Sequence, residues 1–441
     1  MTRMVVCLSF LFLFVIAHES EFIVNTKQGP IRGITISSIE DREYYAFLGI
    51  PYAKPPVGKL RFKAPEPPSP WDGTYDATEE RNELSGDEDC LYLNVYTNEL
   101  PPTELKAVMV WIHGGCFKSG SGSAMFYAPD HLLTEDVVVV AINYRLGLLG
   151  FLSLPEAGIP GNNGLKDQTM SLIWVQNNIE KFGGDPNKVT IFGESAGGAS
   201  VHYHLLSPMS KVSFKSREGN GSALHEWAYA DPQYMVDKSF NIGERMGCKT
   251  NNANELLACL ENANSDVIIN CTEGKVFSMS NSVVPLRPTV ENAQMTDEQI
   301  FLPESPLELV RQGKFYNVPY ITGINSREGI IYMQEIQSIP GFWDNPRHHL
   351  TLVLGDILSI TPEQADEVVK MAVAYYIGDG DMTSEYTPEI VDMFSDIAFV
   401  RGTVNAAKEH AQLSKSPLYL YLFSFDGDLG IVKLVTNTKL P

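Results

Sequence analysis

The chain has 441 residues, of which 44% are hydrophobic and 20% are charged, and it contains no low-complexity tract and no internal repeat. This composition is typical of a globular chain with a large core. The formal net charge of −21 argues against a nucleic-acid partner, because phosphate recognition needs clustered lysine and arginine. Ordinary solubility and steering of cationic substrates are alternative explanations of the acidic balance.

The first clear pattern is an apolar run over residues 4–17, which follows Arg3 and ends in Val15-Ile16-Ala17. A basic start, a short apolar stretch and a small-residue end are typical of a cleaved signal peptide. The run is also too short to span a bilayer comfortably. We therefore predict a signal peptide over residues 1–20, a secreted, extracellular mature chain and no stable membrane anchor. An uncleaved anchor is the alternative.

Residues 21–72 alternate short apolar segments with glycine and proline, which predicts an antiparallel hairpin followed by a rigid surface arm. Residues 91–96 alternate as a strand does. Residues 107–112 and 137–144 are continuous apolar runs, which is typical of strands covered on both faces. These segments predict the first strands of a central sheet.

A helix is predicted over residues 166–182, where Leu172, Val175 and Ile179 recur at helical spacing, and a strand over 189–192. Three later segments are predicted as strand, helix and strand: 319–324, 362–377 and 418–425. Strand, helix and strand in alternation indicate a mostly parallel sheet flanked by helices. Since no linker-like stretch interrupts the pattern, we predict one α/β domain over residues 21–441.

Residues 193–197 read G-E-S-A-G and stand between the apolar strand 189–192 and a run of small, helix-prone residues. A G-x-S-x-G motif in this setting predicts a nucleophile elbow, a turn so tight that only small neighbours let the serine hydroxyl project from the sheet. An ordinary glycine-rich loop is the alternative. The flanking strand and helix favour Ser195 as a nucleophile.

A serine hydroxyl needs donors for an oxyanion, an acid and a base. His113-Gly114-Gly115 follows a predicted buried strand, where glycines leave backbone N–H groups free to face a tetrahedral oxyanion. A plain strand-ending turn is the alternative. Glu328 follows the strand 319–324, the position in chain order of the acid, and a solvated loop carboxylate is the alternative there. Asp396 is the second candidate, with a structural role favoured.

Once Cys7 leaves with the signal peptide, an odd number of cysteines remains, so at least one thiol is unpaired within the chain. Cys248 and Cys259, eleven residues apart, are placed to close a small surface loop. The sequons at Asn220 and Asn270 predict glycosylation in a secreted chain.

Several motifs resemble, in order, those of one family: residues 47–53 (F-L-G-I-P-Y-A), 88–96 (E-D-C-L-Y-L-N-V-Y), 143–145 (N-Y-R), 161–168 (G-N-N-G-L-K-D-Q), 182–186 (F-G-G-D-P) and the elbow. The chain is similar, from about residue 28 to residue 428, to the type-B carboxylesterases, the cholinesterase-like branch of α/β-hydrolases. Secreted insect carboxylesterases are the most similar in character.

The resemblance implies an α/β-hydrolase fold, hydrolysis of small-molecule carboxylic esters, and neither a cofactor nor a metal. It implies Ser195 as nucleophile and Glu328 as triad acid. The oxyanion donors that it implies lie in the glycine turn and after the serine: Gly114, Gly115, Cys116 and Ala196. Cys116 stands where the family usually has glycine or alanine, so its thiol is expected to crowd the hole. Cys248 and Cys259 resemble the second disulfide of the family.

The family's catalytic histidine lies in a Gly-x-x-His stretch beyond the last strand predicted here, and the sequence to Pro441 contains no such stretch. The nine histidines offer no evident substitute. We therefore expect a C-terminally truncated fold and a nearly inactive enzyme, because loss of the triad histidine costs about 10⁶ in kcat in another serine hydrolase.

Two further departures concern the fold. Cys90 has no earlier mature cysteine with which to form the family's first disulfide. Residues 215–220 read K-S-R-E-G-N, which is too polar for the central strand that the family has there, so we expect a sheet that lacks this strand. If Asn220 occupies the place of that strand, its sequon is expected to be buried and unused.

Three functional hypotheses stay open. The first is a secreted serine esterase, of which this chain is an incomplete or crippled form. The second is an esterase-like binding or adhesion protein without activity, and the third is a non-functional fragment. Retention of Ser195, Glu328 and the glycine turn favours the first, because a binding protein needs no activated serine.

Overall fold

The computed structural model describes residues 22–425, apart from residues 40, 82–85, 212–215, 273–285, 334–335, 337–338, 379 and 381. The side chains of residues 216, 217, 220 and 270–272 are likewise outside the description. The predicted signal peptide over residues 1–20 and the predicted C-terminal truncation therefore lie outside the described residues, as do the side chains of Asn220, Asn270 and Cys271.

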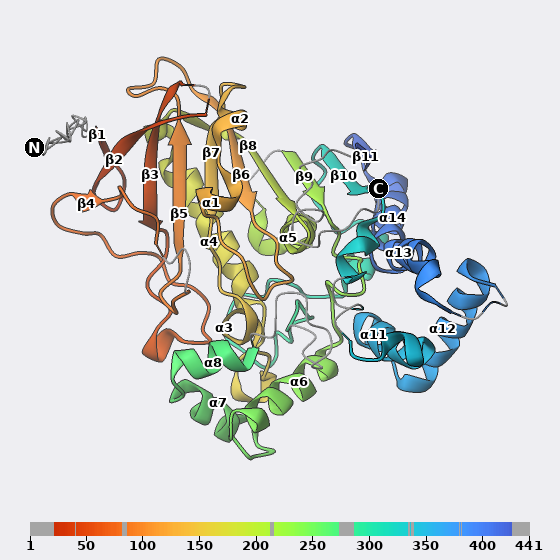
Figure 1. The fold of residues 1–441 in the computed structure, drawn as a ribbon. Coiled ribbons are helices and arrows are strands. Elements are labelled where there is room, and N and C mark those ends of the chain that lie inside the picture. Colours follow the sequence, from red (N-terminus) through yellow and green to blue (C-terminus); the bar gives the residue numbers. More distant parts are fainter. Residues whose placement is uncertain are drawn as a thin grey trace, which may run out of the picture.

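One mixed sheet runs through the described part of the chain (Figure 1). Its strands are β1 (Phe22–Asn25), β2 (Pro30–Ser37), β3 (Glu43–Pro51), β4 (Tyr75–Asp76), β5 (Tyr92–Thr97), β6 (Lys106–Ile112), β7 (Val138–Ile142), β8 (Gly184–Glu194), β9 (Ser216–Asn220), β10 (Tyr320–Asn325) and β11 (Leu418–Phe423). They lie in the order β1-β2-β3-β5-β7-β6-β8-β9-β10-β11, with β4 beside β2.

The neighbouring strands from β1 to β7 in this order are antiparallel, and those from β7 to β11 are parallel. Parallel strands bring their carboxyl ends to one edge of the sheet, which is where open α/β sheets bind ligands. The ends of β6, β8 and β10 carry the predicted glycine turn, elbow and acid. The fold therefore gathers these three segments at one edge.

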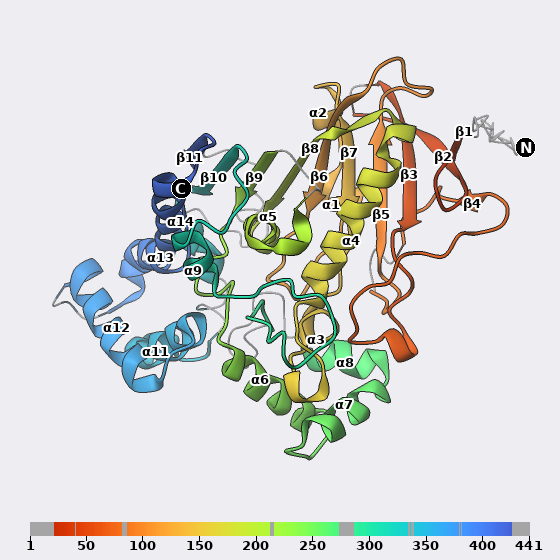
Figure 2. The ribbon, with the colours of Figure 1, turned by 180° about the vertical axis from the view of Figure 1, so that it is seen from behind.

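Helices flank the sheet, and Figure 2 shows α4 and α5 in front of it. The α-helices are α1 (Ala124–Tyr127), α2 (Asp130–Leu133), α3 (Gly147–Phe151), α4 (Asn163–Asn178), α5 (Ala196–Leu206), α6 (Pro232–Arg245), α7 (Ala253–Glu261), α8 (Ser265–Thr272), α9 (Pro306–Arg311), α11 (Pro346–Leu358), α12 (Pro362–Tyr376), α13 (Thr387–Ser395) and α14 (Arg401–Leu413). Short 3₁₀ turns are η1 (Gly58–Leu60), η2 (Pro155–Ala157), η3 (Ile179–Phe182), η4 (Pro208–Ser210), η5 (Glu328–Tyr332), η6 (Phe342–Asp344) and η7 (Ser384–Tyr386), and η8 (Asp396–Val400) is a π-helical turn.

The main apolar core lies on the sheet and under α4. Every residue of β7 is buried, which confirms the prediction that this continuous apolar run is covered on both faces. Leu172 and Val175 of α4 are buried in the same cluster. A separate apolar cluster, which includes Leu354, Val369 and Phe394, lies among α11, α12 and α13.

The expectation that residues 215–220 are too polar for a central strand is wrong. Ser216–Asn220 form β9, which pairs in parallel with β8 on one side and β10 on the other. The strand fits because glycines bring the backbone close to α5: a Cβ at Gly219 would lie 3.2 Å from the carbonyl oxygen of Gly198. The polar composition of these residues therefore does not prevent strand formation, because the pairing of β9 depends on backbone hydrogen bonds.

Among the described residues, every helix is too short or too polar to cross a membrane.

Candidate active site

The elbow joins β8 to α5. Ser195 has φ 56° and ψ −120°, a backbone conformation that non-glycine residues rarely adopt and that marks a strained functional turn. A Cβ at Gly193 would lie 2.6 Å from the carbonyl oxygen of Ile112, and one at Gly197 would lie 1.9 Å from the same atom. Glycine is required at both positions, as the G-x-S-x-G motif predicts.

The predicted glycine turn packs directly on the elbow. Ile112, the last residue of β6, pairs with Gly193 of β8. The turns that follow the two strands therefore begin side by side at the same edge of the sheet. A Cβ at Gly114 would lie 2.8 Å from the carbonyl oxygen of Glu194 and 3.1 Å from the Cβ of Ser195. Only glycine fits at position 114, and the turn lies close to the serine, as an oxyanion hole beside its nucleophile requires.

Backbone amides of this turn are available to a ligand. Among the described residues, the N–H groups of Gly114, Gly115 and Ala196 donate no hydrogen bond to a described partner. Cys116 and Phe117 both have φ near 60°, which turns the chain sharply away after the glycines. The thiol of Cys116 is half-buried and forms no disulfide.

Glu328 lies at the start of η5, just beyond β10. The backbone N–H of Asn325 donates to its Oε1 at 2.7 Å. Burial raises the pKa of Glu328, and this N–H lowers it in part. Although part of Glu194 is exposed, desolvation of its carboxyl group, together with the nearby charge of Glu328, raises the pKa of Glu194 to about 7. The acid and the elbow therefore lie close enough to interact electrostatically.

Packing on α13 fixes the turn that carries Glu328. The N–H of Gly329 donates to Ser395 Oγ at 2.8 Å, and a Cβ at Gly329 would lie 2.1 Å from the carbonyl oxygen of Val391. Asp396, the second candidate for the acid, accepts a hydrogen bond from the hydroxyl of Tyr376. This contact agrees with the structural role that we favoured for Asp396.

A buried polar network anchors α5 behind the elbow. Gln168 Nε2 donates to Ser200 Oγ at 3.1 Å, and Ser200 Oγ donates to the carbonyl oxygen of Ala196 at 2.8 Å. The loop after β9 closes on the elbow from another side, because a Cβ at Gly221 would lie 2.4 Å from the carbonyl oxygen of Ser195. Sequence reasoning missed this contact because it placed residues 215–220 outside the sheet.

The buried histidines described by the structure are hydrogen-bonded away from Ser195. His113 Nδ1 donates to the carbonyl oxygen of Gly114, His204 contacts Ser210 and Gln168, His202 contacts Ser222 and His410, and His225 contacts Phe399 and Thr403. His131 and His348 are exposed, and His349 stacks on Phe342. Within residues 22–425, as far as they are described, no histidine is hydrogen-bonded to Ser195.

The lowered pKa values of two of these histidines predict that the folded chain loses stability in acid. Burial lowers the pKa of His113 and of His225 to about 4, whereas an unfolded histidine titrates near 6.5. Below pH 6.5 the unfolded chain therefore binds more protons, so the stabilisation is complete above this pH and is lost as the pH falls towards 4. Each histidine contributes roughly 3 kcal/mol to this loss. The raised pKa of Glu194 acts in the opposite direction, because it lowers stability as the pH rises.

We therefore expect His225→Gln to flatten the dependence of unfolding free energy on pH between 6.5 and 4, relative to the parent chain. Urea unfolding across this range measures the slope, and the difference between the two proteins removes the contribution of Glu194. Parallel curves for parent and variant would contradict this prediction. Loss of the hydrogen bonds of His225 to Ser222, Phe399 and Thr403 shifts the variant curve without changing its slope.

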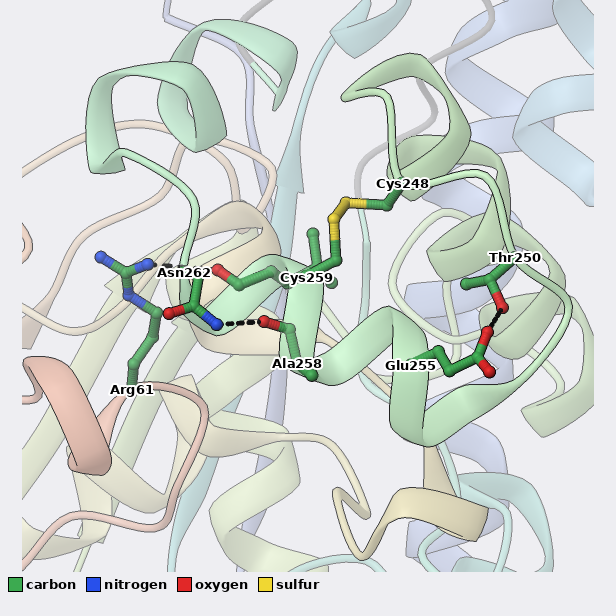
Figure 3. The surroundings of a disulfide bond; sticks show 8 residues. Arg61, Cys248, Thr250, Glu255, Ala258, Cys259 and Asn262 are labelled. Carbon is green, nitrogen blue, oxygen red and sulfur yellow. Dashed lines mark hydrogen bonds between the residues drawn. A yellow bond between two sulfur atoms is a disulfide. The ribbon is translucent and has the colours of Figure 1, made fainter.

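The predicted disulfide is present and joins Cys248, just after α6, to Cys259 in α7, with Cα atoms 6.0 Å apart (Figure 3). Arg61 holds the end of α7 in place, because its Nη1 donates to the carbonyl oxygens of Leu260, Glu261 and Ala263. Cys90 is unpaired, as expected. Glycosylation at Asn220 and Asn270 stays a prediction, since neither side chain is described.

Comparisons with known proteins agree with this geometry. A sequence model of the carboxylesterase family matches residues 20–432. Venom carboxylesterase-6 of Apis mellifera is 37% identical over 94% of this chain and 77% of its own length, and esterase FE4 of Myzus persicae is 38% identical over 93% and 74%. The crystal structure of juvenile hormone esterase from Manduca sexta, with OTFP covalently attached, superposes with a TM-score of 0.84 at 28% identity, covering 95% of this chain and 81% of that one.

Proposed function

The chain belongs to the carboxylesterase family and has its α/β-hydrolase fold, and from this premise we propose that Ser195 is the nucleophile of carboxylic ester hydrolysis. Glu328 is the triad acid in this proposal, and the N–H groups of Gly114, Gly115, Cys116 and Ala196 form the oxyanion hole. The substrates are small-molecule carboxylic esters. The close approach of the backbone at Gly114 to Ser195 is the observation that carries the proposal.

In the proposed reaction, Ser195 Oγ attacks the ester carbonyl carbon and forms a tetrahedral intermediate whose oxyanion faces the turn amides. The alcohol then leaves with a proton, and the acyl group remains on Oγ. Water attacks the acyl-enzyme, and the acid leaves as Ser195 regains its proton. Both halves of the cycle need a base to accept and return a proton.

For the 441-residue polypeptide, we propose a low rate of turnover. Its buried histidines are hydrogen-bonded to other partners, and residues 426–441 contain no histidine. A serine without a base is a weak nucleophile, so what remains is the contribution of the oxyanion hole and of substrate binding. The same lack slows deacylation, and an activated ester should therefore leave its acyl group on the enzyme.

Secretion belongs to the same proposal. The pattern of residues 1–20 supports export, and the disulfide between Cys248 and Cys259 supports an oxidising compartment, where such bonds form and persist.

Acyl trapping tests the proposed nucleophile. We expect the purified chain, incubated with p-nitrophenyl acetate, to gain one acetyl group that peptide mapping by mass spectrometry locates on Ser195. In Ser195→Ala this acetyl group should be absent, while any acetylation of lysine persists. Acetyl groups on lysine alone in both proteins would refute the proposal, and saturable binding of the ester without acylation would favour an esterase-like binding protein.

A further inference from the structure

Three carbonyl groups of the glycine turn accept hydrogen bonds from groups within the protein. We infer that His113 and Tyr144 are positioning residues that aim the turn amides at the oxyanion, an inference that rests on the proposed role of Ser195. Neither side chain needs to touch the reacting atoms for this role. Each acts through one peptide group of the turn.

The carbonyl groups of three successive residues each accept hydrogen bonds. Tyr144 donates its hydroxyl to the carbonyl oxygen of His113 at 2.9 Å. His113 donates from Nδ1 to the carbonyl oxygen of Gly114 at 2.7 Å, and this assigns the ring proton, because a carbonyl oxygen can only accept. The backbone N–H groups of Lys118 and Ser119 both donate to the carbonyl oxygen of Gly115 at 3.0 Å.

A hydrogen bond to a carbonyl group also fixes the direction of the N–H group in the same peptide unit, which belongs to the next residue. A trans peptide is planar, so its C=O and its N–H point in opposite directions. The carbonyl of His113 shares a peptide with the N–H of Gly114, and the carbonyl of Gly114 shares one with the N–H of Gly115. Hydrogen bonds to these carbonyls therefore fix the direction of both amides beside the elbow.

Both side chains are closely packed. The rings of His113 and Tyr144 stack at 4.5 Å with an interplanar angle of 21°, and both are buried. A Cβ at Gly120 would lie 2.5 Å from His113 Nδ1 and 2.7 Å from the carbonyl oxygen of Gly114, so glycine is required where the chain passes this hydrogen bond. The neighbour of Tyr144, Arg145, is fixed by a buried ion pair with Asp167.

This arrangement is preorganisation of the kind that electrostatic catalysis needs. Amide donors stabilise a developing oxyanion most when their direction is fixed before the reaction, because no reorganisation is then required. Without the hydroxyl of Tyr144 or Nδ1 of His113, the corresponding peptide can rotate. A donor displaced by about 1 Å can cost about 10²-fold in rate.

The test uses Tyr144→Phe and His113→Phe, which keep an aromatic ring in each place and remove only the donor. Tyr203→Phe is the matched control, because Tyr203 is also buried and donates its hydroxyl to a backbone carbonyl, that of Ala228, at 2.8 Å. The readout is inactivation of Ser195 by an alkyl fluorophosphonate at alkaline pH with imidazole in excess. The phosphonyl oxygen enters the oxyanion hole during the covalent step, whereas the first encounter does not use it.

We expect the rate constant of the covalent step, kinact, to fall by about 10- to 100-fold in Tyr144→Phe and His113→Phe, with an unchanged encounter constant KI and an unchanged kinact in Tyr203→Phe. Equal kinact values in parent and Tyr144→Phe would overturn the inference, as would an equal fall in Tyr203→Phe. If His113→Phe does not fold, Tyr144→Phe decides. Absence of any Ser195 adduct in the parent chain would instead refute the proposed function, on which the inference rests.

Discussion

Imidazole in solution is expected to raise ester hydrolysis by the 441-residue chain by up to about 10²-fold, because a base that is not held in position contributes no more than the least effective positioned one. The expectation follows from a serine that sits beside available amides, with no described histidine bonded to it. Imidazole can accept the proton of Ser195 during acylation and activate water during deacylation. Initial rates with p-nitrophenyl butyrate, measured against imidazole concentration, give the size of the effect.

Imidazole also hydrolyses activated esters by itself. The informative quantity is therefore the difference between the imidazole-dependent rates of the parent chain and of Ser195→Ala. Ser195→Ala should show only this background, and its rate should increase with imidazole as buffer alone does. An imidazole-dependent increment that is the same in parent and Ser195→Ala would show that the serine takes no part. Retained activity of the parent without imidazole, at the level of an intact triad, would contradict the proposed low turnover.

Asp167→Asn is expected to lower the free energy of unfolding by about 3–5 kcal/mol, the usual cost of breaking a buried ion pair. Arg145 and Asp167 have no exposed side-chain surface, and two guanidinium nitrogens donate to the two carboxylate oxygens at 2.6 and 2.8 Å. Removing the negative charge leaves the guanidinium buried and unpaired. The pair joins α4 to the chain after β7 and so also supports Tyr144.

Glu409→Gln serves as the control for this change. It removes an ion pair with Arg311, whose side chain is 59% exposed, and surface pairs of this kind contribute about 0–1 kcal/mol. Urea unfolding of the parent and the two variants compares their stabilities. Similar losses in Asp167→Asn and Glu409→Gln would contradict the account of the buried pair.

Much of the fold was predictable from local patterns. The apolar run 137–144 contains β7, and the helical spacing within 166–182 falls on α4 and η3. The segments of the candidate site were predictable for a related reason. An elbow and a glycine turn need small residues at fixed spacing around Ser195 and Gly114. Close backbone contacts therefore require glycines at positions that can be recognised in the sequence.

The parts that sequence reasoning missed depend on contacts between distant segments. Residues 215–220 contain no apolar run, and β9 forms because β8 and β10 pair with its backbone while Gly219 lies close to α5. The hydroxyl of Tyr144 reaches a carbonyl 31 residues earlier in the chain. No local pattern marks such a bond, because only the register of β6 and β7 brings the two residues together.

The most direct test of the central claim is a crystal structure of the chain with a trifluoromethyl ketone bound. We expect a covalent bond from Ser195 Oγ to the ketone carbon, with the resulting oxyanion about 2.7–3.1 Å from the amide nitrogen atoms of the glycine turn. A ketone hydrate bound away from Ser195, or an adduct whose oxygen points away from Gly114 and Gly115, would contradict the claim.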